Sequence, residues 1–570
     1  MVVMLMGSII RKKIKGSTYY YYVESKRVDG KPKLVNQKYL GNAEALRDKC
    51  TFSLQENALY SDIAAFGDIT LLYDLAQRLD IAGMIDGIVP KRKQGASVGE
   101  YILTASLNRA VCPTSKNGLK EWYADTCLPL VTGYRPSDFT AQNFWNNTDI
   151  TPESLRTIEE AIVEKVVTQY KLDTSRLIYD ATNFFTYMDT NNESKLAQRG
   201  HSKEKRSDLK IIGASLMVTP DHNIPLFHET YPGNRPDAEQ FAETLKQLSE
   251  RHTRVLGRAP DVTIVFDRGN NSLENIKFIE CMEPRPHYVG GLTSSQCKDL
   301  YDVPLNEYLP LGAGFRNGET AYRTTKEVFG REHTVVILRN PKLLEGQLQG
   351  ICNNAAKAMS QLGQLQKKLE DRKAGIIKKG KRPSVESTVK NIENILHAEY
   401  MKDLFTFSVT EDGEHLSFKF EWHEDLLESL AQRKLGKTAF FTDRDDFTNE
   451  EIISAYRSAW HVEQAFRQMK DPDHLAVRPV FHWTDDRIRV HIFCCVLAYR
   501  LCCLIQKELD GMGVPLSIDR ILDETAKVKS VTSFFGTPEK AVSVRTFSRS
   551  SDIGEQIMEA YRLREKYSVR

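Results

Sequence analysis

Seven short segments between residues 175 and 292 constrain the fold of this chain more than any other feature of its sequence. Five of them are rich in β-branched and aromatic residues and predict strands: 175–182, 209–219, 224–231, 261–270 and 286–292. The other two have the apolar spacing that predicts amphipathic helices: 237–252 and 272–281. The resulting order of strands and helices predicts an α/β domain whose mixed sheet has helices on its faces.

Acidic residues stand at the ends of two of these strands and on a later helix. Asp180 and Asp267 each follow a short apolar run, and Glu463 lies in 449–470, which we expect to form one helix. Each acid has an ordinary explanation when taken alone. Acids at strand ends commonly form turns, and Glu463 has Arg467 as an ion-pair partner four residues later.

Taken together, the three acids indicate a metal site. Strand ends of a mixed sheet lie side by side, and a helix packed across them presents a further acid. Three converging carboxylates repel one another unless cations neutralise them, and oxygen ligands favour Mg²⁺ or Mn²⁺ over zinc. We therefore expect the carboxyl oxygens of Asp180, Asp267 and Glu463 to lie within metal-bridging distance. Two ions roughly 3.5–4 Å apart would activate a water or a 3′-hydroxyl for phosphodiester displacement.

The segment around Glu463 also carries a family pattern. Tyr456, Glu463 and Lys470 stand at the spacing Y-x2-R-x3-E-x6-K. With the two strand-end aspartates, this pattern resembles the YREK signature of DDE transposases from bacterial insertion sequences, in the "insertion sequence four" superfamily. Ala459 stands at the arginine position of the signature. Arg457, two residues earlier, points about 160° away on an ideal helix, so it is not expected to replace that arginine.

The resemblance covers roughly residues 175–500 and includes four further stretches: YDATNFF (179–185), HSKEKRSDL (201–209), YPGNRPDAEQF (231–241) and FDRGNNSLEN (266–275). It implies a ribonuclease H-like catalytic domain that is interrupted by an α+β insertion and preceded by a hairpin and helices. The implied activity is metal-dependent cleavage at transposon ends, followed by 3′-hydroxyl strand transfer into target DNA in a cut-and-paste reaction. Asp180, Asp267 and Glu463 would be the catalytic metal ligands for two Mg²⁺ ions, with Mn²⁺ as a possible substitute.

Two other functions stay open at this point. One is a ribonuclease H-like nuclease or resolvase that cleaves without joining, and the other is a transposase-derived DNA-binding protein that is no longer catalytic. The resemblance implies DNA partners, namely the terminal inverted repeats and a target duplex, and a homodimer when two ends are synapsed.

Several residues are candidates to contact DNA phosphates. They lie on the Glu463 helix, after Asp180 and in the densest basic stretch of the chain: Tyr456, Arg467 and Lys470; Lys203, Lys205 and Arg206; Lys378, Lys379, Lys381 and Arg382. A solvated charged surface is the alternative explanation for these clusters. Because the formal net charge of the 570-residue chain is only +2, a nucleic-acid surface must be local.

The predicted organisation has six parts. They are an N-terminal β-hairpin region (1–58), a helical and DNA-end-binding region (59–172), the first part of the ribonuclease H-like domain (173–292), an inserted α+β domain (293–437), the second part of the ribonuclease H-like domain (438–525) and a C-terminal segment (526–570). We expect the stretch 131–149, rich in Thr, Gly, Pro, Asn and Asp, to be a linker.

Cysteine usage and hydropathy bear on the compartment. The ten cysteines form no CxxC pair, which indicates a reduced, cytosolic protein. The apolar run 492–505 is short and contains Arg500, so we expect no membrane segment. With the family resemblance, we expect a bacterial cytoplasmic protein associated with the nucleoid.

Overall fold

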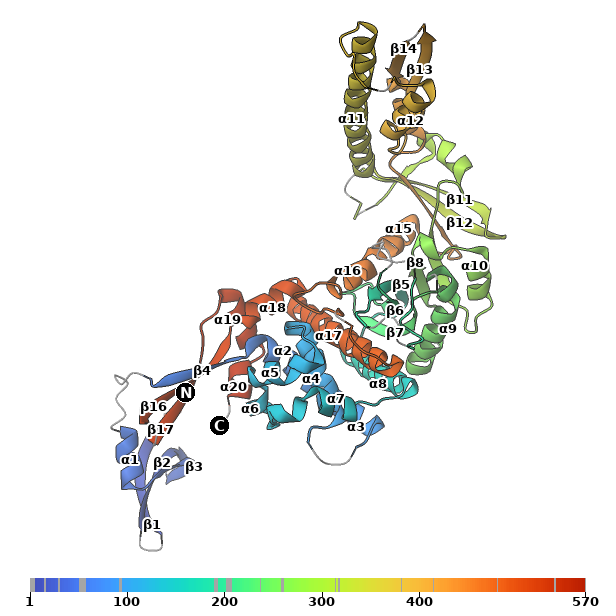
Figure 1. Ribbon diagram of the computed structural model, residues 1–570. Helices are drawn as coiled ribbons and strands as arrows, with labels where there is room; N and C mark the ends of the chain where they lie inside the picture. Colours follow the sequence, from blue (N-terminus) through green and yellow to red (C-terminus); the bar gives the residue numbers. More distant parts are fainter. Residues whose placement is uncertain are drawn as a thin grey trace. The chain divides into compact units, whose positions relative to one another are not determined.

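The two ends of the chain fold together into one unit, and the middle forms a second. In the computed structural model (Figure 1), the first unit contains Met1–Thr70, Asp125–Val131 and Asp523–Arg570, and the second contains Leu71–Ala124 and Thr132–Leu522. The structure describes all residues except 1–5, 15–16, 29–30, 51–57, 92–94, 189–192, 201–207, 236, 258–260, 313, 316–317, 381, 414, 479, 538–539 and 569–570.

The first unit contains two antiparallel three-stranded sheets. One has the order β1 (Met6–Ile14), β2 (Ser17–Val28) and β3 (Lys31–Gly41). The expected N-terminal β-hairpin region (1–58) therefore contains an antiparallel pair, β2 and β3, although residues 29–30 between these strands lie outside the described residues. The second sheet has the order β17 (Lys540–Phe547), β16 (Lys529–Thr537) and β4 (Tyr60–Ala65). The purely helical region expected from residue 59 is thus wrong at its start, because β4 pairs with a strand more than 400 residues later.

Short helices accompany these sheets and lead into the second unit. They are α1 (Ala43–Cys50), α6 (Leu128–Thr132), α19 (Asp552–Ala560) and α20 (Leu563–Tyr567), while α2 (Gly67–Arg78) and α18 (Ile518–Ala526) each span the boundary. The second unit then begins with α3 (Ile81–Ile88), α4 (Val98–Val111), α5 (Leu119–Ala124), α7 (Ala141–Asn147) and α8 (Pro152–Tyr170).

The expected linker at 131–149 is wrong. This stretch contains a 3₁₀ turn, Pro136–Phe139, and helix α7, and both Phe139 and Phe144 are fully buried. Their rings pack edge-on against Tyr101 of α4. Turn-forming residues predict where the chain bends, but they do not show that the apolar side chains between them join a core.

A nine-stranded mixed sheet is the centre of the second unit. Its order is β10 (Leu309–Pro310), β11 (Thr320–Val328), β12 (Arg331–Arg339), β15 (Lys437–Thr442), β9 (His287–Leu292), β8 (Thr263–Phe266), β5 (Arg176–Phe185), β6 (Ile211–Val218) and β7 (Pro225–Pro232). The pairs β5–β8 and β8–β9 are parallel, and the other pairs are antiparallel. The predicted mixed sheet is therefore confirmed.

Helices cover both faces of this sheet. Tyr179 on β5 packs against Phe241 of α9 (Asp237–Leu256), whereas Phe184 on β5 packs against Phe466 of α16 (Trp460–Gln468). Odd and even positions of a strand point to opposite faces, so α9 and α16 lie on opposite sides of β5. Helix α10 (Leu273–Glu280) connects β8 to β9 and contacts α9.

The insertion is smaller than the range 293–437 indicates. Strands β10, β11 and β12 extend the central sheet, so these three strands belong to it and not to a separate domain. The rest consists of α11 (Pro341–Lys373), α12 (Val385–Ile395), α13 (Met401–Leu404), β13 (Phe405–Asp412), β14 (His415–Trp422) and α14 (Glu424–Arg433). These elements enclose their own hydrophobic core, which includes Leu362, Ile392 and Phe418.

Helix α17 (Asp485–Gly511) is long and apolar enough to cross a membrane, and it is the one helix of the described chain that meets this test. However, 94% of its most apolar window is buried inside the protein. It contacts α4 and β7, as the core helix of a folded domain does.

A buried ion network joins α8, β7, α9 and α17. Glu159, fully buried on α8, accepts hydrogen bonds from His228, Arg251 and Arg500 at 2.8, 2.8 and 2.9 Å. Burial alone would raise the pKa of Glu159, but these partners hold it well below its ordinary 4.5. A depressed pKa in the folded state means that this stabilisation is present above about pH 4.5 and is lost as the pH falls toward the folded value.

Glu159→Gln is expected to destabilise the protein by about 3–5 kcal/mol, because it leaves the buried charge of Arg500 without its carboxylate partner and removes one of the three carboxylates around Arg251. Urea denaturation of the full chain at pH 7 measures this change. The control Glu164→Gln, at an exposed position of the same helix, should shift stability by less than about 0.5 kcal/mol. Equal stability of the two variants would contradict the role of the network.

Candidate active-site cleft

The first two acids come from neighbouring parallel strands at the centre of the sheet. Tyr179 of β5 lies opposite Phe266 of β8, so Asp180 and Asp267 are the next residues in this register. Parallel strands run about 4.8 Å apart, which places the two acids side by side. Because side chains alternate, Asp180 shares the face of Phe184, and this is the face that α16 covers.

Asp180 was expected to stand at the end of its strand, but the strand continues beyond it. β5 continues to Phe185, but its pairing with β8 stops at Tyr179. From Asp180 onward, β5 pairs only with β6 among its neighbours in the sheet. Asp180 is therefore the first residue of β5 whose other flank is open, and it is half-buried, whereas Asp267 is exposed at the end of its strand.

The single helix expected at 449–470 is wrong: the structure has two, α15 (Asn449–Arg457) and α16. α15 begins at a capping box in which Thr448 and Glu451 satisfy each other's backbone N–H groups. Near Ser458 the bonding tightens, because the amides of Ala459 and His461 donate to carbonyls three residues earlier. The Ser458 hydroxyl also donates to the Ala455 carbonyl at 2.5 Å, and such local bonds compete with helix continuation.

All three acids line one cleft of about 470 Å³. Asp180 comes from β5, Asp267 from the end of β8 and Glu463 from the first turn of α16, where its side chain is exposed. The wall also contains Tyr456, Arg457, Ala459 and Trp460 around the helix break, with Asn340, Leu343, Thr438 and Phe440 near the base of the insertion. The structure thus brings together the three acids that the sequence singled out, from segments far apart in the chain.

The three carboxylates line the same cleft but do not converge on one point. Among the residues that the structure describes, no group of three or more His, Cys, Asp or Glu side chains is close enough to hold a metal ion. The expected metal-bridging geometry is therefore not present. The donor chemistry nevertheless fits a hard divalent cation, since all three groups are carboxylates and no Cys or His is among the described residues that line the cleft.

Residues 171–501, more than half of the chain, match the family model described as "Transposase DDE domain". The chain belongs to this transposase family. Members of the family generally use divalent metal ions. No curated protein matches the transposase in sequence. The structure is similar to a chain in the cryo-EM structure of the piggyBac transposase synaptic complex with hairpin DNA. The two chains are 10% identical, the match covers 81% of this chain and 80% of the piggyBac chain, and the TM-score is 0.36.

Tyr456, which lies just before the break between α15 and α16 of the transposase, contacts Asp267. Its hydroxyl donates to Oδ1 of Asp267 at 3.2 Å, and its ring packs on Phe440 of β15. Burial, with the neighbouring Asp267, raises the pKa of Tyr456 to about 12, so the phenol stays a proton donor at neutral pH. Gly291 on β9 makes room for this contact, because a Cβ there would overlap the Tyr456 hydroxyl.

Arg457 lines the cleft, contrary to the argument from an ideal helix. It is the last residue of α15, and the helix break makes the geometry of one continuous helix inapplicable. Its guanidinium forms an ion pair with Glu319, which is only 4% exposed, and lies 5.2 Å from the ring centre of Phe315. Ala459 also lines the cleft and adds no charge.

Lys470 and Arg467, the two basic residues near Glu463 that were expected to contact phosphate, differ from each other in their surroundings. Lys470 donates to the Thr182 hydroxyl at 2.9 Å, so it is tied to β5. Arg467 is exposed, and the described part of the chain contains no ion pair between it and Glu463. Trp460 is 53% exposed and lines the cleft.

The remaining basic candidates lie away from the cleft wall or outside the described residues. Lys203, Lys205, Arg206 and Lys381 are not among the residues that the structure describes. Lys378, Lys379 and Arg382 are exposed in the turn after α11, and Lys378 and Arg382 line a hollow of about 410 Å³ with His415 of β14.

Tyr456→Phe is expected to slow DNA cleavage about 10-fold or more, because a hydrogen bond to a charged group is worth about 1.5–3 kcal/mol. Tyr322→Phe is the matched control, since its hydroxyl has no partner among the described residues. Cleavage of labelled transposon-end DNA under single-turnover conditions gives the rates. Equal rates for the two variants would show that the contact with Asp267 has no role in positioning that acid.

Proposed function

We propose that this transposase cuts DNA at the ends of a mobile element and joins the freed 3′-hydroxyl to a target duplex, in a cut-and-paste reaction. One observation carries the proposal: acids from two parallel strands and a later helix line a single cleft within the family-matched region. The central order β7-β6-β5-β8-β9, with helices on both faces, supports a ribonuclease H-like assignment for this domain.

Asp180, Asp267 and Glu463 are the residues that would hold divalent cations, with Mg²⁺ as the proposed ion and Mn²⁺ as a substitute. Bound cations would neutralise charge on the reacting phosphate and lower the pKa of an attacking hydroxyl. The chain's own contribution is to fix the acids: Tyr456 orients Asp267 through its hydroxyl, and the open flank of β5 leaves Asp180 accessible.

Cations around the cleft are suited to hold the DNA strand. Arg457 presents a guanidinium at the cleft wall, and Glu319 and Phe315 fix its position. Both terminal nitrogens of this guanidinium already contact Glu319, so a phosphate contact would use its remaining N–H groups. We propose that Arg457 supplies the phosphate contact that Ala459 cannot make, and that exposed Arg467 contacts the same strand further along.

The proposed partners are the terminal inverted repeats and a target duplex, with a homodimer when two ends are held together. A bacterial cytoplasmic, nucleoid-associated location is part of the same proposal.

Asp180→Asn, Asp267→Asn and Glu463→Gln should each reduce strand cleavage by about 10³-fold or more, because each removes a charged metal ligand worth several kcal/mol. Gel assays with transposon-end DNA and Mg²⁺ measure cleavage, and filter binding measures DNA affinity, which should remain. Glu274→Gln, exposed on α10, is the control. Full activity in any of the three variants would remove that acid from the catalytic set.

The same experiment separates the two other functions. With pre-cleaved ends supplied, a transposase joins them to target DNA, whereas a nuclease or resolvase does not. A protein that binds the ends but neither cuts nor joins them in Mg²⁺ or Mn²⁺ would be a non-catalytic DNA-binding derivative.

The combined change of Lys378, Lys379 and Arg382 to Ala should weaken DNA binding and reduce the slope of log K against log salt by about 2–3, near 0.9 for each lost phosphate contact. The control changes Lys357, Lys390 and Lys402 to Ala, which removes the same charge from exposed sites elsewhere in the insertion. Fluorescence anisotropy over a range of salt concentrations measures both. Equal slopes would identify the basic turn as a solvated surface.

A further inference from the structure

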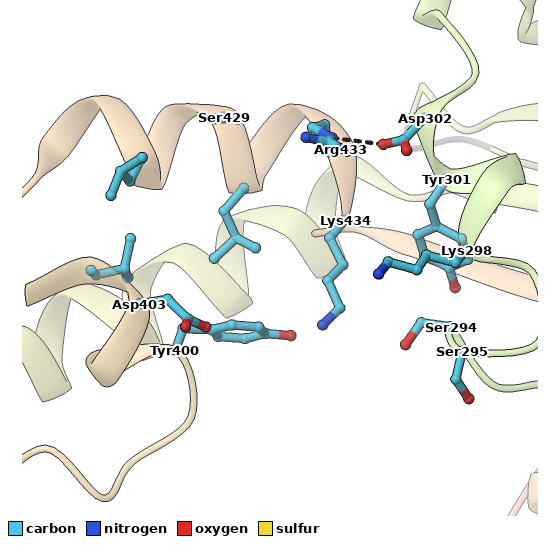
Figure 2. A pocket seen from close by; sticks show the side chains of 13 residues that line it. Ser294, Ser295, Lys298, Tyr301, Asp302, Tyr400, Asp403, Ser429, Arg433 and Lys434 are labelled. Carbon is cyan, nitrogen blue, oxygen red and sulfur yellow. Dashed lines mark hydrogen bonds and ion pairs between the residues drawn. The ribbon is translucent and has the colours of Figure 1, made fainter. Parts of the chain in front are cut away.

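A second cavity, of about 500 Å³, lies between the insertion and the sheet domain (Figure 2). Its walls come from three segments: the turn after β9 with the 3₁₀ turn Lys298–Asp302, helix α13 with the preceding Tyr400, and one side of α14. None of its lining residues belongs to the cleft that holds the three acids.

Two lysines give this cavity a cationic side. Figure 2 shows the side chains of Lys298 and Lys434 extending into the space between Tyr400 and Ser294. Lys298 has no ion-pair or hydrogen-bond partner among the described residues, and the Nζ of Lys434 lies 5.0 Å from the ring centre of Tyr400. The neighbouring Arg433 is already neutralised, since its Nε donates to Asp302 at 2.6 Å.

The opposite side of the cavity is apolar. Leu404, Leu426 and Leu430 line it with the Tyr400 ring, and Leu426 is 43% exposed. Tyr400 adopts a left-handed backbone conformation with φ of 66°, which is unusual for a residue with a large side chain. Burial, with Glu399 and Asp403 nearby, raises the pKa of Tyr400 to about 12, so its ring stays neutral.

Two acids line the cavity: Asp302, which is paired with Arg433, and Asp403, which lies beside Tyr400 and has no cation partner in the described part of the chain. The cavity therefore has three chemical regions: lysines that suit an anion, an apolar and aromatic wall that suits a flat ring, and a carboxylate that accepts hydrogen bonds from an amino group. An inorganic anion would satisfy only the first of these.

The cavity also lies next to the sheet edge that carries the acids. Asp267 follows β8 and Ser294 follows β9, and these two strands are parallel neighbours. Their carboxyl ends therefore lie at the same edge of the sheet. The cleft and the cavity therefore both adjoin this edge.

We propose that this cavity binds a nucleotide unit, with the phosphate between Lys298 and Lys434, the base against Tyr400 and the leucines, and an amino group of the base directed to Asp403. Two sources supply the same chemistry, a nucleotide of the DNA strand or a free mononucleotide. The first source rests on the proposed function, whereas the second does not.

The test compares Lys298→Ala/Lys434→Ala and Tyr400→Asn with the unaltered protein and with Lys402→Ala, an exposed control on α13 outside the cavity. Asn tolerates the left-handed conformation, so Tyr400→Asn removes the ring without backbone strain. Calorimetric titration of the full chain without divalent metal uses dAMP, dTMP, inorganic phosphate and a 20-nucleotide single strand. Circular dichroism confirms folding of each variant.

A loss of affinity of 10-fold or more for dAMP in both variants, with Lys402→Ala unchanged, supports the site with a free nucleotide as ligand. The same loss for the single strand alone supports it with DNA as the source. Stronger binding of dAMP than of dTMP supports the role of Asp403. Unchanged affinity for both nucleotide and strand overturns the proposal, as does equal binding of phosphate and dAMP. Because this titration contains no metal, a failure to bind nucleotide would say nothing about catalysis by the three acids in the cleft.

Discussion

The parallel pairing of β5 with β8 is the interaction on which the candidate site depends. In this register Asp180 and Asp267 are neighbours at one edge of the sheet. A slip of one residue would turn Asp180 to the opposite face, toward α9, where Tyr179 packs on Phe241. That aromatic contact and the fully buried residues of both strands therefore hold the register as well as the core. The crossover through β6, β7 and α9 is what a parallel pair requires.

The break between α15 and α16 determines what else faces the cleft. One continuous helix would send Arg457 away from the side of Glu463. With the break at Ser458, both residues line the same cleft, together with Trp460. Tyr456 just before the break contacts Asp267, and the missing side chain at Gly291 leaves space for that contact. The break thus brings a guanidinium, paired with Glu319, to the same cleft wall as the uncharged Ala459.

Local patterns in the sequence predicted those parts of the fold that depend on local interactions. The start of α8 is an example: Thr151 caps the helix and Pro152 is its first residue, and these are residue types that local interactions favour there. The mixed sheet and the grouping of three acids also followed from apolar runs and their order. Long-range pairing did not: β4 pairs with β16, and β11 and β12 join the central sheet, because no local signal specifies a distant partner.

The helix break was missed for a related reason. Ile452 to Lys470 keeps the spacing of one helical face across the break, so periodicity alone predicts one helix. The available signal was Ser458, whose hydroxyl competes for a backbone carbonyl.

The insertion leaves and rejoins the central sheet at neighbouring points. Its first helix begins after β12 and its last ends before β15, and these two strands pair directly, from Arg339 opposite Lys437 onward. Because both connections leave one edge of the sheet, the insertion needs no change in the central strands. Its base, at Asn340 and Thr438, also forms part of the cleft wall, so the two points where the insertion leaves the sheet adjoin the three acids.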